Sequence, residues 1–372
     1  MDAKPEDRAL AEEAVEVLRR RLPDIWGVEL GEQPGPSGTD LTLIIGTPQT
    51  STRAALLEVK RGFRPADIET LTGGLSRRLR AAAGDASIVI VSDSLSPRSR
   101  ELLAREDIGY IDLDGNIRLS LGYPGLYIET TGRERRPRSS TSGPGPRTLR
   151  GAQAGRLARC LADVRPPYGV VDIAKTTGLS RGYVSLLLDF LADERLISRE
   201  PRGRVTDVDW PALLRRRAEA VDLFKTNMTI PFIASNGARA ALDALLGEAT
   251  IGAVVTGSFA AYRRAPVAAP TLLTFYTLAD SAIAQRALGL LPADEGADVI
   301  VLRPPNKVPL QLPEEDEGIS YAAPTQVVID CLAGPGRMPA EGEALIEAMK
   351  DEEDRWRRPD LETYLREIGG PS

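Results

Sequence analysis

The stretch "VVDIAKTTGLSRGYVSLLLDFLADERLI", residues Val170–Ile197, carries the clearest structural pattern in the chain. Apolar residues recur at helical spacing on both sides of Gly178, and glycine commonly stands just past the end of a helix. Ser180 stands where the next helix begins, and a serine there can accept a hydrogen bond from a free backbone N–H group. With Val184 and Leu188 facing the core, the pattern predicts two helices joined by a short glycine-containing turn.

The segments on either side extend this pattern. The preceding stretch "AGRLARCLADV" is apolar at helical spacing, and the following "ISREPRGRVTDVDW" is typical of two short strands around Pro-Arg-Gly. The order helix, helix, helix, hairpin predicts a winged helix-turn-helix over residues 152–210.

This arrangement predicts binding of double-stranded DNA, because the start of the second helix is where a recognition helix contacts base edges and a basic hairpin can straddle phosphates. Arg156, Arg159 and Arg165, on and just after the preceding helix, favour the same interpretation. An alternative is a winged helix that contacts only proteins. RNA is less favoured, because no aromatic stacking platform for single strands is present. The predicted DNA-binding residues are Ser180, Arg181, Tyr183, Ser185, Arg199, Arg202 and Arg204. A domain this small usually gains affinity from a second copy, so a homodimer is expected.

The net charge of −6 is unusual for a DNA-binding chain, but the charge is segregated. Residues 133–204 hold fifteen Lys and Arg against seven Asp and Glu, a balance of +8. Residues 314–372 hold six against fifteen, a balance of −9. The pattern indicates an acidic C-terminal segment that folds over the basic middle and moderates DNA binding.

Composition excludes several classes of chemistry. The chain of 372 residues has no histidine, which removes Ser-His-Asp and Cys-His nucleophiles and histidine-ligated metals. Two distant cysteines favour a reducing compartment. No apolar run is long enough for a membrane helix, and the N-terminus is predicted to be an acidic amphipathic helix and not a signal peptide. We therefore predict a cytoplasmic, nucleoid-associated protein with no membrane partner.

Residues 1–130 alternate between helical and strand patterns. A helix over 8–21 is followed by the strand "WGVEL", a turn-rich "GEQPGPSG" and the strand "TDLTLIIG". A third strand, a helix over 66–84, the buried run "ASIVIVS", another helix and the strand–turn–strand "GYIDLDGNIRLSL" complete a predicted mixed α/β sheet. Residues 131–151, rich in Arg, Ser, Pro and Gly, are predicted to form a basic linker.

The third strand of this region holds Glu58 and Lys60 on one face, because side chains alternate along a strand. Antiparallel pairing with the strand that begins near Asp40 brings the two carboxylates to one sheet edge, where Asp40 and Glu58 are candidate Mg²⁺ ligands. Lys60 can orient or deprotonate an attacking water, so the three residues are the candidate catalytic set. An ordinary solvated strand face is the simpler alternative. The pattern Asp40 … Glu58-Val59-Lys60 resembles the PD-(D/E)xK restriction-endonuclease-like fold. The resemblance implies either a Mg²⁺-dependent DNA endonuclease or a domain that keeps this fold but does not cleave DNA.

Residues 211–372 are predicted to form a third, α/β domain with an acidic C-terminus. The stretch "VVTGSFAAYRRAPVAAP" resembles the strand–Gly-Ser–helix opening of nucleotidyltransferases, with Gly257 and Ser258 at a phosphate. No pair of acidic residues for metal binding follows closely, so the resemblance implies a degenerate domain that acts as a scaffold or binds a partner.

Several stretches together resemble actinobacterial proteins grouped with the AbiEi-type antitoxins of type IV toxin–antitoxin systems. They include "RPPYGVVDIAKTTGLSRGYVS", "LISREPRGRVTDVDWPALLRR", "VVTGSFAAYRRAPVAAP" and "APTQVVIDCLAGPGRMPAEGEALIEAM". The resemblance implies a winged-helix transcriptional regulator with a possible cognate toxin as partner. The best-known members carry the winged helix at the N-terminus, whereas here a nuclease-like region precedes it.

Overall fold

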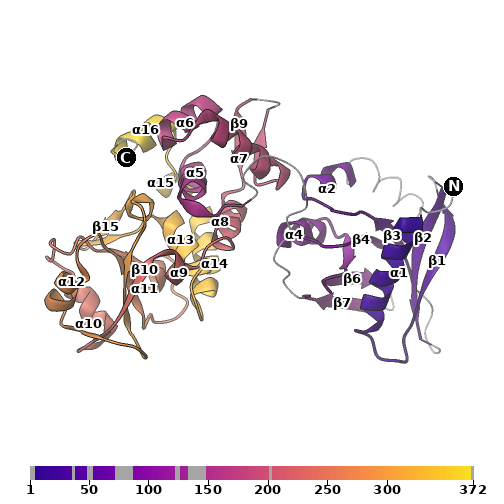
Figure 1. Cartoon of the computed structure of the whole chain (residues 1–372), viewed down its shortest axis with the longest axis horizontal. Helices are drawn as coiled ribbons and strands as arrows, with labels where there is room; N and C mark the ends of the chain where they lie inside the picture. The colour runs from indigo at the N-terminus through magenta and orange to yellow at the C-terminus, as the bar shows by residue number, and fades with distance from the viewer. Residues whose placement is uncertain are drawn as a thin grey trace. The chain divides into compact units, whose positions relative to one another are not determined.

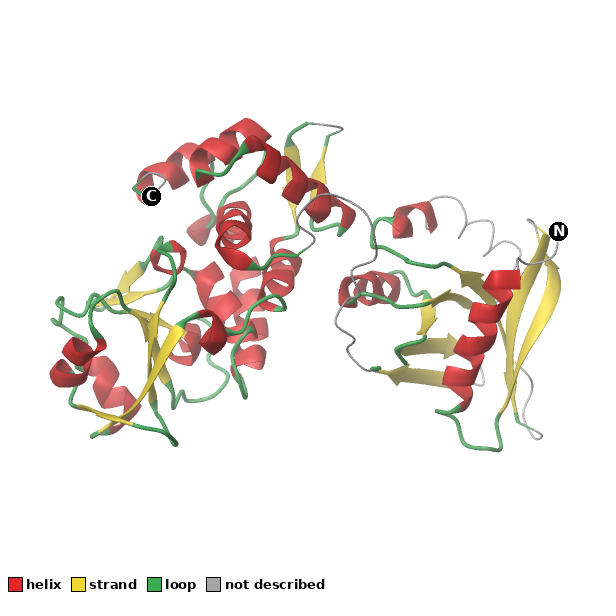
Figure 2. Cartoon of the chain, in the orientation of Figure 1, coloured by secondary structure: helices red, strands yellow, loops and turns green. Residues whose placement is uncertain are grey.

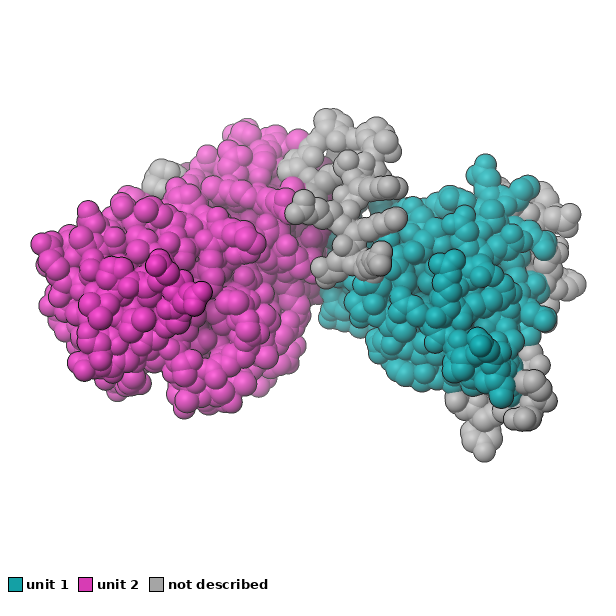
Figure 3. Space-filling view, turned by 60° about the horizontal axis from the view of Figure 1, so that its bottom comes forward, with its two compact units in different colours: residues 1–143, 193–195 teal, residues 144–192, 196–372 magenta. Residues whose placement is uncertain are grey.

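The structure is a computed structural model that describes residues 5–35, 38–47, 53–71, 87–121, 126–132, 148–200 and 203–369 (Figures 1 and 2). The chain is mixed α/β, as predicted. It divides into two compact units (Figure 3). Unit 1 comprises residues 1–143 and 193–195, and unit 2 comprises residues 144–192 and 196–372.

Unit 1 is built on a seven-stranded mixed sheet in the sequential order β1 to β7. The first three strands pair antiparallel, β3, β4 and β5 are parallel to one another, and β6 and β7 return antiparallel. The strands are β1 Gly27–Gly35, β2 Gly38–Gly46, β3 Arg53–Val59, β4 Ser87–Ser92, β5 Gly109–Asp112, β6 Ile117–Leu121 and β7 Leu126–Thr130. The described helices are α1 Pro5–Arg19, α2 Asp67–Thr70 and α4 Pro97–Arg105.

Helices cover both faces of this sheet. The apolar side of α1, with Leu10 and Leu18, packs with Leu57 and other residues of one face. On the opposite face, Leu56 packs with Ile68 of α2 and with residues around α4. Neighbouring residues of β3 therefore serve different cores, as strand alternation requires.

Two predictions for unit 1 need correction or lie outside the described residues. The stretch 31–35, expected as a turn, is the second half of β1 and pairs with β2 as far as Gly35 and Gly38. Pro34 is tolerated there because β1 is an edge strand, where a missing N–H leaves no ladder bond unmade. Of the helix expected over 66–84, α2 is described, and residues 72–84 lie outside the described ranges. The predicted linker also lies largely outside them, at 133–147.

Unit 2 contains a helical part followed by a second seven-stranded mixed sheet, in the order β13-β10-β14-β12-β11-β16-β15. Its helices are α5 Gly151–Asp163, α6 Val170–Thr177, α7 Arg181–Asp193, α8 Trp210–Ala218, α9 Leu223–Thr226, α10 Gly237–Asp243, α11 Gly257–Tyr262, α12 Ser281–Ala287, α13 Pro324–Leu332, α14 Met338–Lys350, α15 Glu353–Trp356 and α16 Leu361–Glu367, with a 3₁₀ turn at Val308–Leu310. Its strands are β8 Ile197–Arg199, β9 Val205–Val208, β10 Met228–Ala234, β11 Val254–Thr256, β12 Leu273–Tyr276, β13 Leu290–Pro292, β14 Val299–Arg303, β15 Glu314–Asp316 and β16 Ile319–Tyr321, of which β8 and β9 form a separate two-stranded sheet.

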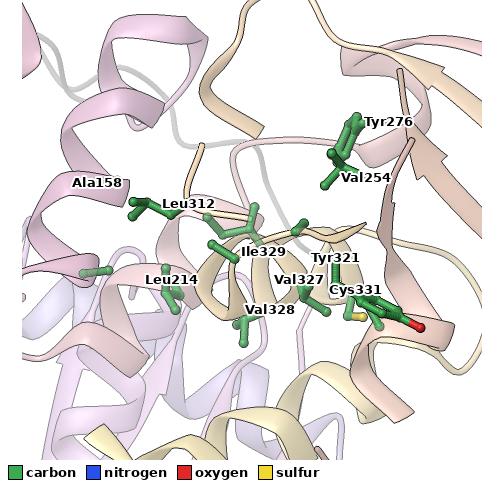
Figure 4. Packing of buried hydrophobic residues seen from close by; sticks show 14 of the residues in the cluster. Ala158, Leu214, Val254, Tyr276, Leu312, Tyr321, Val327, Val328, Ile329 and Cys331 are labelled. Carbon is green, nitrogen blue, oxygen red and sulfur yellow. The ribbon is translucent and has the colours of Figure 1, made fainter. Parts of the chain in front are cut away.

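One continuous apolar core joins the helical part of unit 2 to its sheet. Ala158 of α5, Leu214 of α8 and Val328 of α13 belong to the same cluster of buried side chains (Figure 4). Helix α13 is the centre of this core, because its residues from Pro324 to Cys331 are all buried. Residues 152–210 and 211–372 thus lie in one compact unit.

Helix α13 carries three buried polar residues, Thr325, Gln326 and Asp330, of which the last two lie one turn apart. The Gln326 Oε1 accepts a hydrogen bond from Arg159 Nη1 at 2.8 Å, and its Nε2 donates to Asp330 Oδ1 at 2.7 Å. The other oxygen of Asp330 accepts from the hydroxyls of Thr256 at 2.6 Å and Tyr276 at 2.9 Å. These bonds connect α5, α13 and two strands through the middle of the core.

The same network begins with an ion pair on α5. Arg159 and Asp163 lie one turn apart, at 3.1 Å, and both side chains are at most 2% exposed. The second oxygen of Asp163 accepts a hydrogen bond from Thr325. A buried charge is tolerated when it is paired and its remaining lone pairs are bonded, which is the case here.

Within the described residues, no helix combines the length and the apolar character needed to cross a bilayer.

Burial raises the pKa of Asp330 from 3.8 to about 6, against the lowering effect of its three donors. Below pH 3.8 the carboxyl is neutral in the folded and unfolded chains, and above pH 6 the folded protein alone bears the cost of a buried charge. The higher pKa in the folded state therefore stabilises the folded protein fully at low pH. This stabilisation is lost as the pH rises from about 4 to about 6, and its total is about 3 kcal/mol.

We expect Asp330→Asn to remove most of this pH dependence, because the two hydroxyls can rotate to accept hydrogen bonds from the new amide. Urea unfolding at pH 5 and pH 7 would measure it. Asp243→Asn, which alters a half-exposed carboxylate on α10, is the matched control and should leave the pH dependence as in the parent. Identical pH dependence in the parent and Asp330→Asn would contradict this assignment.

Candidate functional site

The turn between α6 and α7 has the geometry expected of a helix-turn-helix. Three residues separate the helices, and Gly178 ends α6 in the left-handed region at φ 68°, which a residue with a Cβ rarely adopts. Leu179 is buried beneath the turn. Ser180 caps α7, since its Oγ accepts a hydrogen bond from the backbone N–H of Tyr183 at 3.2 Å. The turn is thus fixed by one glycine, one apolar anchor and one cap.

The two strands that follow α7 form the predicted hairpin. Strands β8 and β9 pair antiparallel from Ile197 opposite Val208. Tyr168, between α5 and α6, adds a separate antiparallel bridge to β9, because its N–H and C=O both bond Val205, at 3.2 and 2.9 Å. This bridge connects the hairpin to the segment between α5 and α6. The elements follow one another in the order α5, Tyr168 bridge, α6, α7, β8 and β9.

The predicted DNA-binding residues are not equally accessible. Ser180 and Arg181 are exposed at the start of α7, and Arg204 is exposed at the start of β9. Tyr183 and Ser185 are half-buried, and burial raises the pKa of the Tyr183 hydroxyl. Arg202 lies outside the described residues.

Arg199 differs from the expectation of an exposed wing arginine. Its side chain is only 11% exposed, and its Nη1 contacts Asp189 Oδ1 of α7 at 2.5 Å. The residue therefore joins the hairpin to α7.

The arginines around α5 are also engaged within unit 2. Arg156 donates to the carbonyl of Thr177 at 3.1 Å, at the end of α6. Arg159 is buried in the core network, and Arg165 is ion-paired with Asp354. Arg156, Arg159, Arg165 and Arg199, four of the cations counted in the middle segment, are therefore engaged within unit 2. Among the described residues around the turn and hairpin, the exposed cations without an ion pair are Lys175, Arg181 and Arg204.

The acidic C-terminal segment lies against the helical part of unit 2. Besides the contact of Asp354 with Arg165, Glu353 accepts a hydrogen bond from the indole of Trp210 at 2.5 Å. Trp356 packs edge-to-face on Trp210 with ring centroids 4.9 Å apart. Helix α16 contacts α6 (Figure 1). The expected contact between the acidic end and the middle segment is present, and its effect on DNA binding stays a prediction.

In unit 1, the predicted catalytic residues lie where β3 ends. The Lys60 Nζ contacts Glu58 Oε1 at 2.8 Å, with side chains 45% and 24% exposed. The register of β2 and β3 pairs Leu41 with Leu57, so backbone positions 40 and 58 are the next neighbours across this ladder. Asp40 belongs to β2, and its side chain lies outside what the structure describes.

The ends of the neighbouring parallel strands also carry acidic residues. Asp93, just after β4, accepts hydrogen bonds from the N–H of Gly62 at 2.8 Å and from Ser92. Asp112, at the end of β5, is buried, which raises its pKa, and it accepts three bonds from Leu95 and Asn116. These two carboxylates hold turns together. Among the described residues, no group of three or more Asp, Glu or Cys side chains is placed to hold a metal ion.

The Gly257-Ser258 pair does open a helix after a strand, as the resemblance to nucleotidyltransferases implies. Ser258 is buried, however, and its hydroxyl donates to Glu341 of α14 at 2.5 Å. A Cβ on Gly257 would lie 3.1 Å from Met338 Cε. Because α14 covers this turn and presents a carboxylate to it, a phosphate is disfavoured there.

Sequence reasoning missed a polar pocket in unit 2. It lies among α5, the end of α8 with the following loop and α9, β12, the loop 305–309 and α13, and it includes Arg159, Arg217, Tyr276 and Asp330. The available signal was two pairs of polar residues at i and i+4 inside apolar helices, Arg159 with Asp163 and Gln326 with Asp330. Such residues usually signal a buried bonded network, since an apolar helix face has no water to solvate them.

Comparisons of the chain with protein-family models, curated proteins and solved structures find no match.

The contrast between Arg199 and Arg204 leads to a stability prediction. Arg199→Ala should lower the free energy of unfolding by about 1–2 kcal/mol, because it removes a largely buried side chain and its contact with α7. Arg204→Ala should change it by less than about 0.5 kcal/mol, as is usual for an exposed residue. Urea denaturation followed by circular dichroism would measure both. Equal effects of the two substitutions would refute the assigned role of Arg199.

Proposed function

We propose that residues 151–208 bind double-stranded DNA as a winged helix-turn-helix and that the protein acts as a DNA-binding regulator. The observation that carries this proposal is the capped, glycine-containing turn that leads into α7, with Arg181 exposed and without an ion pair at its first position. The hairpin tied to Tyr168 supports the same function.

The parts of this surface have separate roles in the proposal. Helix α7 has thirteen residues and buries Val184, Leu187, Leu188 and Leu191, so its opposite side is free to enter a major groove. The free N–H groups and positive dipole end at its start favour a phosphate. Arg181 reaches a base edge or a phosphate, and Arg204 of the hairpin contacts the backbone.

The described part of the turn and hairpin makes a limited electrostatic contribution. Each neutralised phosphate contributes roughly 0.9 to the slope of log affinity against log salt. Among the described residues there, the exposed cations without an ion pair are Lys175, Arg181 and Arg204, so this surface of one copy supplies a modest slope that a homodimer would double. The role of an antitoxin-like transcriptional regulator, with a cognate toxin as partner, follows from the resemblance described above.

The DNA-binding proposal is tested by fluorescence anisotropy with genomic duplexes, including the region upstream of the protein's own gene. The double variant Arg181→Ala/Arg204→Ala should bind roughly tenfold or more weakly and lose about 2 from the salt slope for each bound chain. Arg239→Ala, an exposed arginine ion-paired on α10, is the matched control and should bind like the parent. Absence of saturable binding by the parent, or an unchanged double variant, would refute the proposal.

A second candidate function, Mg²⁺-dependent cleavage of DNA, is favoured by a separate observation in unit 1. The order α1, β1, β2, β3, α2, β4, with three antiparallel strands and β4 parallel to β3, agrees with the predicted restriction-endonuclease-like arrangement. Backbone positions 40 and 58 are neighbours across the β2–β3 ladder, and the Lys60 ammonium contacts the Glu58 carboxylate just beyond.

In this second proposal, Asp40 and Glu58 would hold Mg²⁺, which supplies stabilisation of the negative charge that develops on the phosphate. Glu58 is free to do so once its contact with Lys60 is exchanged, since both side chains reach solvent. Lys60 then directs its Nζ towards an attacking water and holds it in position. A scaffold that has lost cleavage is the alternative outcome.

Incubation of supercoiled plasmid with Mg²⁺, Mn²⁺ or EDTA tests this second function. We expect metal-dependent nicking by the parent that Asp40→Ala, Glu58→Ala and Lys60→Ala each abolish, with DNA affinity nearly intact. Glu13→Ala, an exposed carboxylate on α1, controls for the change in charge. Nicking that persists in all three variants would exclude these residues, and intact plasmid in every lane would leave unit 1 as a scaffold.

A further inference from the structure

The polar pocket of unit 2 is large enough to admit a small molecule. Its cavity volume is about 60 Å³, which is room for about four water molecules or one ligand of similar size, and it opens to solvent. One wall is formed by α5 and the end of α8, and the other by α13 and the loop 305–309. The charged side chains in it are Arg159, Arg217, Asp222 and Asp330.

Arg217 is the cation in this pocket that lacks an anion. Its Nη1 donates to the carbonyl of Leu149, and among the described residues no carboxylate forms an ion pair with it. Burial lowers the pKa of its guanidinium, and the negative charge of Asp330 opposes that effect. A guanidinium in this position, with donors left over, favours a bound anion.

The backbone of α5 is shaped to receive this guanidinium. A Cβ on Gly155 would lie 2.7 Å from Arg217 Nη2 and 3.1 Å from its Cζ. The guanidinium therefore lies against the helix at a position that only glycine leaves open, so a methyl group at residue 155 would displace it.

The other charged residues of the pocket already have partners. Arg159 is paired with Asp163, and both oxygens of Asp330 accept hydrogen bonds from core residues. Asp222 caps α9 and contacts Lys225 Nζ at 2.8 Å. Arg217 is thus the pocket cation that has no direct ion pair among the described residues, although the charge of Asp330 acts on it from a distance.

The rest of the pocket supplies one further donor and an apolar surface. The amide oxygen of Asn306 accepts from the N–H of Val308 at 3.0 Å, which leaves its Nδ2 without a partner among the described residues. Ile329, Val221, Pro305 and Pro309 also line the pocket. This combination suits a charged head beside a hydrophobic body.

We propose that this pocket binds a small organic acid, with one carboxylate or phosphate group on Arg217 and an apolar body against Ile329 and the neighbouring prolines. The proposal is independent of DNA binding, because it rests on residues of the pocket alone. It assigns unit 2 a ligand-binding site that neither the helix-turn-helix nor the edge of the N-terminal sheet uses.

The test uses the full chain and ligand-detected NMR titration with four probes: benzoate, phenyl phosphate, acetate and inorganic phosphate. Saturable binding of benzoate or phenyl phosphate, tighter than that of the corresponding body-free anion, is expected, and the pair that binds better identifies the head group. Benzyl alcohol, which lacks the charge, should bind at least roughly tenfold more weakly, as expected for loss of a charge-assisted bond.

Two variants connect binding to the proposed residue. Arg217→Gln should weaken benzoate or phenyl phosphate binding roughly tenfold or more, whereas Arg216→Gln, one residue away and paired with Glu219, should not change it.

Gly155→Ala should weaken binding while keeping or raising the unfolding temperature, because alanine favours a helix and only the end of Arg217 must move. This second variant keeps the test valid if Arg217→Gln lowers stability. No saturable binding of either aromatic acid by the parent, or binding unaffected by Arg217→Gln or Gly155→Ala, would overturn the proposal.

Discussion

The hydrogen bonds that run from Arg159 through Gln326 to Asp330 are the constraint on which the architecture of unit 2 depends. A helix as completely buried as α13 could place a carboxylate and an amide in the core only where donors and acceptors meet them. Thr256 and Tyr276 complete the set from the sheet. The helical part and the sheet are therefore held in one register, and the pocket beside Arg217 is a consequence of how they meet.

The two units present their functional candidates in different ways. In unit 1, chain topology alone brings backbone positions 40 and 58 together, and a single ion pair between Glu58 and Lys60 stands at the strand end. In unit 2, local capping at Ser180 exposes the start of α7, while Arg159, Arg165 and Arg199 are engaged in internal ion pairs. Part of the positive charge of the middle segment therefore serves contacts within unit 2.

Local patterns were predictable from the sequence, and long-range partners were not. The turn at Gly178 and the hairpin after Asp112 follow from residues close in sequence, and both are present. The stretch 31–35 was misjudged because glycine and proline disfavour a strand on average, whereas pairing with β2 outweighs that preference. Arg159 was interpreted as a surface cation. Helical spacing shows which face of a helix is apolar, but it does not identify Gln326, 167 positions later, whose carboxamide accepts the hydrogen bond from Arg159.

The shared core of unit 2 also limits how this chain can be taken apart. Ala158, Leu214 and Val328 come from segments that a cut after residue 210 would separate, yet they pack in one cluster. Residues 152–210, cut out of the chain, would therefore expose the apolar side of α5 to water, because α8 and α13 would no longer cover it. Another chain that received this segment alone would have to supply new partners in place of α8 and α13, so the helical part and the sheet of unit 2 are expected to change together.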